Sequence, residues 1–402
     1  MSNTHTHMIK KIKELADRFY PQALDIRRYL HRNPELSFME DKTSEYIASL
    51  LKRAGISCRT GIARTGIVAA LEGVRPGRRT IALRAELDAL PVREETGKDY
   101  ASVNEGVMHA CGHDVHIACL LGASMILKEI KDSFEGTVLF VFQPGEEKAP
   151  GGARLLLDAG ALDNPSPDLI IAQHVLPSLP VGTLGFKPGI YMASSDEIYI
   201  KITGKGGHAA MPHQTTDVIL IASHIIVALQ QIVSRHAEPS VPTVLSFGKF
   251  TAPGAVNVIP SHASLEGTFR TLNEPWRKEA LQKIKTIAQS VATGMGAGCE
   301  VSIVPGYPAL INDPDATKEL RGYASDYLGK ENVFPLDTRM TAEDFAFYSE
   351  KCSLVFYRLG VKNEKISAPA ELHTPLFDID EEAIRTGMGS MAYITYASLG
   401  KA

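Results

Sequence analysis

The chain has 402 residues, and this length predicts two domains, or one large domain with an insertion, rather than a small disulfide-stapled fold. Hydrophobic residues make up 44% of the sequence and charged residues 22%, which is the balance of a soluble globular protein and not of a disordered one. The formal net charge is −4, so no excess of basic residues exists to attract a nucleic acid, and we expect no nucleic-acid partner.

The first part of the chain, residues 1–189, predicts a helix and a loop followed by alternating strands and helices. The apolar pattern indicates strands at 67–71 and 80–83, a helix at 115–131, and further strands at 137–142 and 169–173. Such alternation is typical of an α/β domain in which helices cover both faces of a mixed sheet. Proline and glycine then accumulate over residues 177–189, where we expect one module to end.

The next segment, residues 190–307, predicts a smaller α+β module with the order β-α-β-β-α-β. Its expected elements are strand 197–204, helix 216–235, strands 243–250 and 263–270, helix 274–293 and strand 300–304. A split unit of this kind commonly forms a four-stranded, ferredoxin-like sheet with two helices on one face. Residues 308–402 return to α/β elements, including strand 354–359 and helix 381–397, so we expect the first and last parts to complete one domain around an inserted module.

Export and membrane signals are not evident in the sequence. The first residues lead into the charged stretch 10–14 instead of a continuous apolar run, and the most apolar window, 218–233, is interrupted by polar residues. The cysteines are odd in number and contain no Cys-x-x-Cys pair, which predicts neither a disulfide framework nor a zinc knuckle. We therefore expect no membrane association and a cytoplasmic location.

Metal-ligand side chains concentrate at the start of the predicted helix 115–131. Residues 109–116 read His-Ala-Cys-Gly-His-Asp-Val-His, and on an irregular turn Cys111 and His113 can both face one cation. Thiolate and imidazole suit zinc and similar metals. A buried cysteine beside polar helix-capping groups is the alternative.

A second cluster, Glu146 and Glu147, directly follows the predicted strand 137–142. Open α/β sheets bind ligands at the carboxyl ends of their strands, so one carboxylate could hold a metal while the other acts as a general base. A surface acidic turn is the alternative. His174 ends another predicted strand, where a lone histidine is more often structural. His373 lies near the C-terminus and is uninformative alone. Together, these residues and the cysteine on separate loops indicate a dispersed metal site.

Five segments resemble the M20 metallopeptidase family, in the family's order and over essentially the whole chain. They are residues 30–37 (LHRNPELS), 83–91 (LRAELDALP), 109–114 (HACGHD), 143–147 (QPGEE) and 372–374 (LHT). The match is similar in particular to the amidohydrolase branch, which includes hippurate hydrolases, N-acyl amino acid deacylases and auxin-conjugate hydrolases. The resemblance implies a catalytic α/β domain of residues 1–189 and 308–402, with an inserted lid of residues 190–307.

The resemblance also implies a metal-ligand set: Cys111, His113, Glu147, His174 and His373. Five residues cannot complete two separate four-coordinate sites, so two divalent ions per subunit would need a bridging ligand and a bridging water. Cys111 is the candidate bridge. We expect zinc or manganese, with nickel and cobalt as alternatives, because such ligands accept all of these metals.

By the same resemblance, Glu146 would be the catalytic base, which takes a proton from metal-activated water and passes it to the departing amine. Asp88 would orient a metal ligand from the outer shell. Glu86 stands where the branch usually has aspartate in the motif of residues 83–91. This difference is a departure from the family pattern.

Three lid residues complete the expected site. His208 follows a glycine-rich turn and resembles the histidine that reaches the scissile carbonyl, in some members from the partner subunit. Arg270 resembles the arginine that holds the substrate α-carboxylate, and we expect Asn257 to lie near it. A surface histidine and a plain lid salt bridge are the alternatives for His208 and Arg270.

We therefore expect a metal-dependent hydrolase that cleaves the amide bond of small N-acyl amino acids. Two rival interpretations are an M20 dipeptidase or aminopeptidase, and a catalytically silent metal-binding module that acts through its lid. A homodimer formed through the lid is also expected, because the inserted sheet leaves strand edges to cover.

Overall fold

The computed structural model describes residues 3–363 and 370–400 and divides into two compact units. The first unit comprises Met1–Gly189, Ile311–Asp337 and Phe347–Ala402, and the second comprises Ile190–Leu310 and Thr338–Ala346. The sequence pattern predicts boundaries after residues 189 and 307. Residues 338–346, expected in the first domain, belong to the second unit, because Arg339 N donates to Tyr191 O at 2.8 Å and Ala193 N donates to Thr341 O at 3.0 Å.

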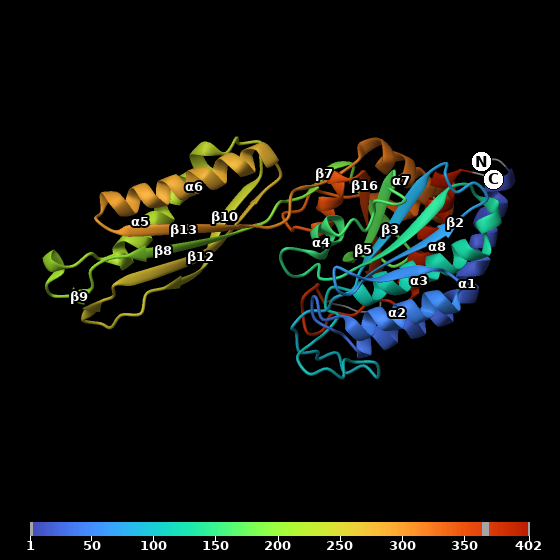
Figure 1. Ribbon diagram of the computed structural model, residues 1–402, viewed down its shortest axis with the longest axis horizontal. Coiled ribbons are helices and arrows are strands. Elements are labelled where there is room, and N and C mark those ends of the chain that lie inside the picture. Colours follow the sequence, from blue (N-terminus) through green and yellow to red (C-terminus); the bar gives the residue numbers. More distant parts are fainter. Residues whose placement is uncertain (1–2, 364–369, 401–402) are drawn as a thin grey trace. The chain divides into compact units, whose positions relative to one another are not determined.

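The first unit is built on an eight-stranded mixed sheet with the order β1-β2-β4-β3-β5-β16-β6-β15 (Figure 1). The central strands β4, β3, β5 and β16 are parallel, and β1, β2 and β6 each pair antiparallel with a neighbour. The strands are β1(Cys58–Ile62), β2(Gly66–Glu72), β3(Thr80–Glu86), β4(Thr137–Gln143), β5(Leu169–Pro180), β6(Leu184–Phe186), β15(Val333–Pro335) and β16(Ser353–Lys362). Short strands β7(Gly189–Met192) and β14(Leu310–Asn312) lie where the chain passes from one unit to the other.

Helices cover this sheet, and its central strands β3 and β4 are buried along their whole length. Parallel strands with both faces covered read as continuous apolar runs, which is the pattern of these segments. Helices α3 and α8 contact the sheet and α1 packs against both. The helices are α1(Asn3–Arg32), α2(Asp41–Arg53), α3(His113–Glu129), α4(Gly152–Asp158), α7(Pro314–Leu328) and α8(Glu382–Leu399), with short turns η1(Lys131–Ser133), η4(Lys330–Asn332) and η5(Asp344–Glu350). The predicted α/β class is confirmed.

The second unit has the predicted order β-α-β-β-α-β. Its four strands pair antiparallel in the order β10-β12-β8-β13, which is the ferredoxin-like arrangement. The elements are β8(Asp196–Thr203), α5(Val218–Leu229), β10(Thr243–Thr251), β12(His262–Thr271), α6(Glu274–Gly294) and β13(Gly298–Pro305), with β9(Gly207–His208), β11(Val258–Ile259), η2(Pro212–Gln214) and the π-helical turn η3(Ile232–His236).

The helix predicted at 216–235 begins later and changes geometry before its end. The Asp217 side chain accepts hydrogen bonds from Ile219 N and Leu220 N, both at 3.1 Å, which caps α5 at its first turn. The stretch Val218–His236, with mean hydropathy 1.7, is long and apolar enough to cross a membrane by length and composition alone. One stripe of α5 is buried in the core of the second unit, and core helices pass the same test.

A buried ionic network fixes the start of α3. The guanidinium of Arg27, on α1, is fully buried and lies 2.9 Å from Asp114 Oδ2 and 2.9 Å from Asp378 Oδ1. His31 Nδ1 lies 2.9 Å from the same Asp114 oxygen. Burial alone would raise the pKa of Asp114, but the Arg27 and His31 charges hold it well below its usual value. The network therefore ties α1 and the segment before α8 to the first turn of α3.

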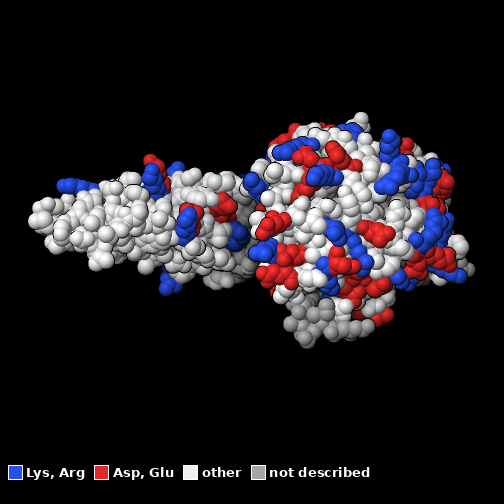
Figure 2. All heavy atoms as spheres, turned by 90° about the horizontal axis from the view of Figure 1, so that it is seen from below, with Lys and Arg blue, Asp and Glu red and all other residues white. Residues whose placement is uncertain are grey.

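Charged side chains are distributed differently over the two units. On the face shown in Figure 2, basic and acidic residues are interspersed over the first unit, whereas the second unit carries few of either sign. This mixture agrees with the small net charge of the chain.

Candidate metal centre

The predicted ligands meet at the carboxyl ends of the parallel strands of the first unit. Strand β3 ends at Glu86, two residues before Asp88, and β4 ends at Gln143, just before Glu146 and Glu147. His174 lies on the neighbouring strand β5. Helix α3 begins beside these ends, so the sheet topology brings together motifs that are far apart in the sequence.

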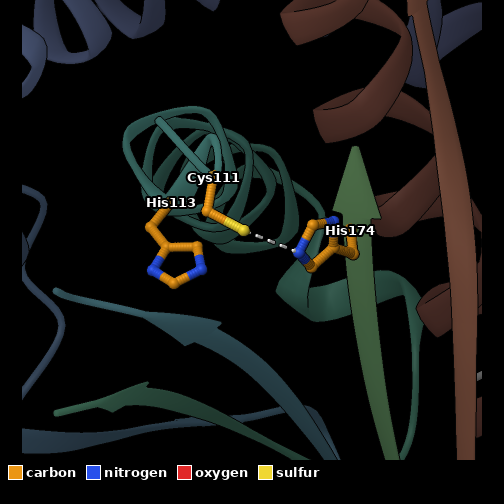
Figure 3. A group of neighbouring side chains, drawn as sticks. All are labelled: Cys111, His113 and His174. Atoms are coloured by element: carbon orange, nitrogen blue, oxygen red, sulfur yellow. Dashed lines mark hydrogen bonds between the residues drawn. The ribbon is translucent and has the colours of Figure 1, made fainter. Parts of the chain in front are cut away.

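The turn before α3 depends on Gly112. This residue has φ 80°, in the left-handed region, and a Cβ at this position would lie 2.7 Å from Val175 Cγ2. Only glycine accepts both the dihedral angle and the close approach. The side chains of Cys111 and His113 leave the turn on the same side, and the Cys111 sulfur points toward His174 of β5 (Figure 3).

The sulfur of Cys111 lies at the centre of the cluster. Cys111 Sγ is 3.5 Å from His174 Nε2 and 3.3 Å from His373 Nε2. Glu147 Oε1 is 3.3 Å from His373 Nε2 and 4.0 Å from His113 Nε2. Two groups of donors, each within 4.8 Å of one another, share the sulfur: Cys111, His113 and His174, and Cys111, Glu147 and His373. A ligand that bridges two ions needs this kind of shared position.

The histidine rings are oriented with one nitrogen toward the cluster. His113 Nδ1 donates to the Asp88 backbone oxygen at 2.8 Å, and His174 Nδ1 donates to the Val175 oxygen at 2.8 Å. Among the described residues, buried His113 Nε2 has no hydrogen-bond partner, and Glu147 Oε1 faces ring nitrogens of His373 and His113. Buried polar atoms rarely remain unsatisfied, and metal-binding histidines usually donate their other N–H in this way. The donor set therefore fits a metal ion.

Asp88 supports two members of this cluster. Its Oδ2 accepts hydrogen bonds from Ser37 Oγ at 2.7 Å and from Glu147 N at 2.9 Å, and its Oδ1 lies 3.2 Å from His113 Nδ1. Although burial would raise the pKa of Asp88, the contact with His113 lowers it. The carboxylate thus orients neighbouring groups.

The electrostatics of the cluster favour a cation. Burial raises the pKa of the Cys111 thiol well above its usual value, and the charges of Glu147 and Glu146 raise it further. Burial opposes protonation of His113, but its contact with Asp88 raises its pKa to about 10. Metal ligation requires a thiolate and a neutral imidazole, so an ion that binds here displaces protons.

Glu146 lies beside the cluster and is buried. It forms a group with His113 and Glu147 in which the ligand-type atoms lie within 4.8 Å of one another. The preceding Gly145 has φ 53°, and a Cβ there would lie 2.3 Å from the Phe38 ring. The tight turn places the two adjacent carboxylates at one end of β4.

Two residues outside the predicted ligand set, Glu86 and His116, also lie near the cluster. His116 Nδ1 lies 2.8 Å from Glu86 Oε2, and its Nε2 accepts from Val175 N at 3.0 Å. Although burial would raise the pKa of Glu86, the charge of Arg84 and the hydrogen bond with His116 lower it well below its usual value. The sequence signals that could have identified them are the third histidine within residues 109–116, which is His116, and the position of Glu86 within the motif of residues 83–91.

The lid residues fall into two separate places within the second unit. His208 is exposed on β9 and pairs with Val258, and Ala209 N donates to Asn257 O at 3.0 Å, so His208 and Asn257 are neighbours. Arg270 lies eight positions after His262, the first residue of β12, which corresponds to about 27 Å along an antiparallel strand. Thr203, at the end of β8 that leads to β9, pairs with His262.

The expectation that Asn257 lies near Arg270 is therefore wrong within one chain. Arg270 is the last residue but one of β12, whereas Asn257 lies beside β9, and Figure 1 shows β9 beyond the other end of β8 and β12. Arg270 is half-buried and donates to Thr268 Oγ1 and, at 3.2 Å, to Phe269 O. It forms no ion pair with any residue in 3–363 or 370–400, and burial lowers its pKa.

Known proteins resemble this chain over most of its length. A family model described as peptidase family M20/M25/M40 matches residues 82–396. The N-acetyl-L-cysteine deacetylase of Bacillus subtilis is 40% identical over 363 residues, which cover 90% of this chain and 85% of that protein. The N-acyl-L-amino acid amidohydrolase of Geobacillus stearothermophilus is 39% identical over 329 residues, which cover 82% and 88% of the two chains.

A solved structure agrees with these relatives. The YXEP protein of Bacillus subtilis, described as a dinuclear metal binding peptidase from the M20 family, superposes with a TM-score of 0.82 at 35% identity, covering 95% of this chain and 99% of that chain. The predicted enzyme class is thereby confirmed. The chain belongs to peptidase family M20/M25/M40 and is a metal-dependent hydrolase of amide bonds.

Proposed function

We propose that the protein removes the acyl group from the nitrogen of a small N-acyl amino acid. The observation that carries this proposal is the pair of donor groups that share Cys111, with Glu146 beside them. The deacetylase and amidohydrolase relatives support the substrate class.

Two divalent ions would be held by the two donor groups, one by Cys111, His113 and His174 and the other by Cys111, Glu147 and His373. Zinc or manganese is expected, with nickel and cobalt as alternatives. When bound, such ions polarise the scissile carbonyl and lower the pKa of water toward about 7. Glu146 accepts a proton from the attacking water and delivers it to the departing amine nitrogen, while Asp88 keeps His113 and Glu147 oriented.

A cytoplasmic location is consistent with this chemistry. The five cysteines are free in the structure, and a thiol that serves as a metal ligand must stay reduced. We propose this location on that ground.

The first prediction concerns Cys111 as the bridge. Cys111→Ala should lose at least one of two ions, because each donor group loses a member. Cys119→Ala is the matched control, since Cys119 is also buried and lies on α3 but outside both groups. Elemental analysis of the purified variants measures the ion content. Two full equivalents of metal in Cys111→Ala would contradict the bridge.

The second prediction separates the two adjacent glutamates. Glu146→Gln should abolish turnover of N-acetyl and N-benzoyl amino acids with metal content near native, because the amide keeps the shape but cannot accept a proton. Glu147→Gln should lose metal, because its carboxylate belongs to a donor group. If Glu146→Gln loses metal and Glu147→Gln does not, the two roles have been exchanged.

The third prediction concerns the substrate carboxylate. Arg270 is half-buried and forms no ion pair with a described residue, so its planar guanidinium is available to a ligand carboxylate. The native enzyme should strongly prefer an N-acyl amino acid to its carboxamide. Arg270→Ala should lose at least about tenfold in kcat/KM on the acid, since removing one partner of such a pair commonly costs about 2–5 kcal/mol.

Metal content should not change in Arg270→Ala, because Arg270 lies in the second unit and the proposed ligands lie in the first. Kinetics on the matched acid and amide measure the preference. An unchanged acid-to-amide ratio in the variant would return Arg270 to a structural role.

We also propose that two copies of the chain associate through the second unit. The outward side of α5 exposes apolar side chains, with Ile219, Leu220 and Val227 exposed by 41%, 49% and 71%, and β10 is an edge strand of the sheet. Arg270 lies about 27 Å along β12 from His262, the residue beside the end of β8 that leads to His208. This separation supports a site shared by two copies of the chain. One small substrate can meet both Arg270 and His208 only if the two residues come from different copies.

The fourth prediction tests this sharing by complementation. Co-expression of differently tagged Glu146→Gln and His208→Ala chains should give hybrid dimers that recover activity. In such a dimer, the site of the His208→Ala chain combines its own native Glu146 with the native His208 of the other chain. The control pairs Glu146→Gln with the double variant Glu146→Gln/His208→Ala, which should stay inactive. Inactive hybrids, or a monomer by light scattering, would contradict the proposal.

A further inference from the structure

We infer that Glu86 and His116 are positioning residues that hold His174 in its metal-binding orientation through the backbone of Val175. The inference rests on the proposed ligand role of His174. It concerns two residues outside the expected ligand set.

The two partners of the His116 ring determine which of its nitrogens carries the hydrogen. The Val175 N–H can only donate, so His116 Nε2, 3.0 Å away, accepts. The hydrogen of the neutral ring must then be on Nδ1, which donates to Glu86 Oε2 at 2.8 Å. Glu86 thereby selects the form of His116 that can bind Val175.

Val175 is also hydrogen-bonded to the ring of His174. The Val175 carbonyl accepts from His174 Nδ1 at 2.8 Å, which leaves His174 Nε2 facing Cys111 Sγ at 3.5 Å. The two imidazole rings are close neighbours, with centroids 4.6 Å apart. The N–H and the carbonyl of one residue therefore connect both rings.

Val175 has little room to move. Its Cγ2 lies where a Cβ on Gly112 would approach to 2.7 Å, and Gly112 is the turn between two proposed ligands. Close-packed interiors transmit such shifts instead of absorbing them. A displaced Val175 would disturb both His174 and the turn that carries Cys111 and His113.

The contacts of residue 86 require the length of a glutamate side chain. Glu86 is fully buried, its Oε1 pairs with Arg84 Nη1 and its Oε2 accepts from His116. Arg84 is itself held by Gln143, whose Oε1 accepts from Arg84 Nε at 2.9 Å. Each carboxylate oxygen has its own donor, and an aspartate, shorter by one methylene, would not reach both donors from the same backbone position.

The test uses two amides that mimic different nitrogens of His116. A glutamine amide reaches the position of Nε2 and can accept from Val175, whereas an asparagine amide reaches the position of Nδ1 and retains only the contact with Glu86. His116→Asn should weaken one of the two bound ions by about 10–100-fold, and His116→Gln should keep nearly native affinity for both. Chelator competition with Zn²⁺ measures the two affinities, and thermal unfolding without added metal measures stability.

His174→Ala is the reference variant. If it loses one ion and His116→Asn weakens the same ion, the inference holds. If it loses one ion and His116→Asn weakens neither, the inference is overturned while the ligand set stands. If it retains both ions, the ligand role and the inference fall together. Two outcomes would reduce His116 to a packing role. In the first, His116→Asn and His116→Gln weaken metal affinity equally; in the second, the affinity for both ions falls together with the unfolding temperature.

Glu86→Gln gives an independent check. Arg84 Nη1 and His116 Nδ1 each need an acceptor, and the glutamine amide offers only one oxygen. The same ion should therefore be weakened as in His116→Asn. Native affinity for both ions in Glu86→Gln would contradict the role of Glu86.

Discussion

The close contact between Gly112 and Val175 is the constraint on which the donor arrangement depends. It joins the turn that begins α3 to the middle of β5 with no space for a side chain on the glycine. From the other side, the buried Arg27 and Asp114 ion pair holds the same turn against α1. Because both contacts are made by the protein itself, the backbone beside Cys111 and His174 is oriented before any ion binds, and less conformational freedom is lost on binding.

The distribution of buried charge distinguishes the metal centre from its surroundings. Asp114 and Glu86 are neutralised by arginines, Arg27 and Arg84, and these pairs have structural roles. Glu147 has no arginine partner among the described residues, and its Oε1 instead lies 3.3 Å from His373 Nε2 and 4.0 Å from His113 Nε2. The outer carboxylates are therefore neutralised within the protein, whereas Glu147 faces two other proposed ligands, where a bound cation would supply the balancing charge.

Sequence patterns predicted most of the architecture because its signals are local. The alternation of strands and helices gave the α/β class. The motifs of residues 109–114 and 143–147 lie at the start of α3 and at the end of β4, where the topology of parallel strands brings them together. The contacts of Glu86 with His116 and of His116 with Val175 were missed, since they join residues far apart in the sequence. The assignment of residues 338–346 failed for the same reason, because backbone pairing with 191–193 decides it.

The misplaced Asn257 has a more specific cause. A motif next to a strand does not reveal which end of that strand it occupies, and β12 separates Asn257 from Arg270 by its own length. A strand is a rigid spacer of about 3.4 Å per residue, so a small substrate cannot compensate for the distance. If both residues contact one substrate, a second copy of the chain becomes part of the catalytic machinery. The apolar surface of α5 would then be selected for assembly of the site as well as for stability.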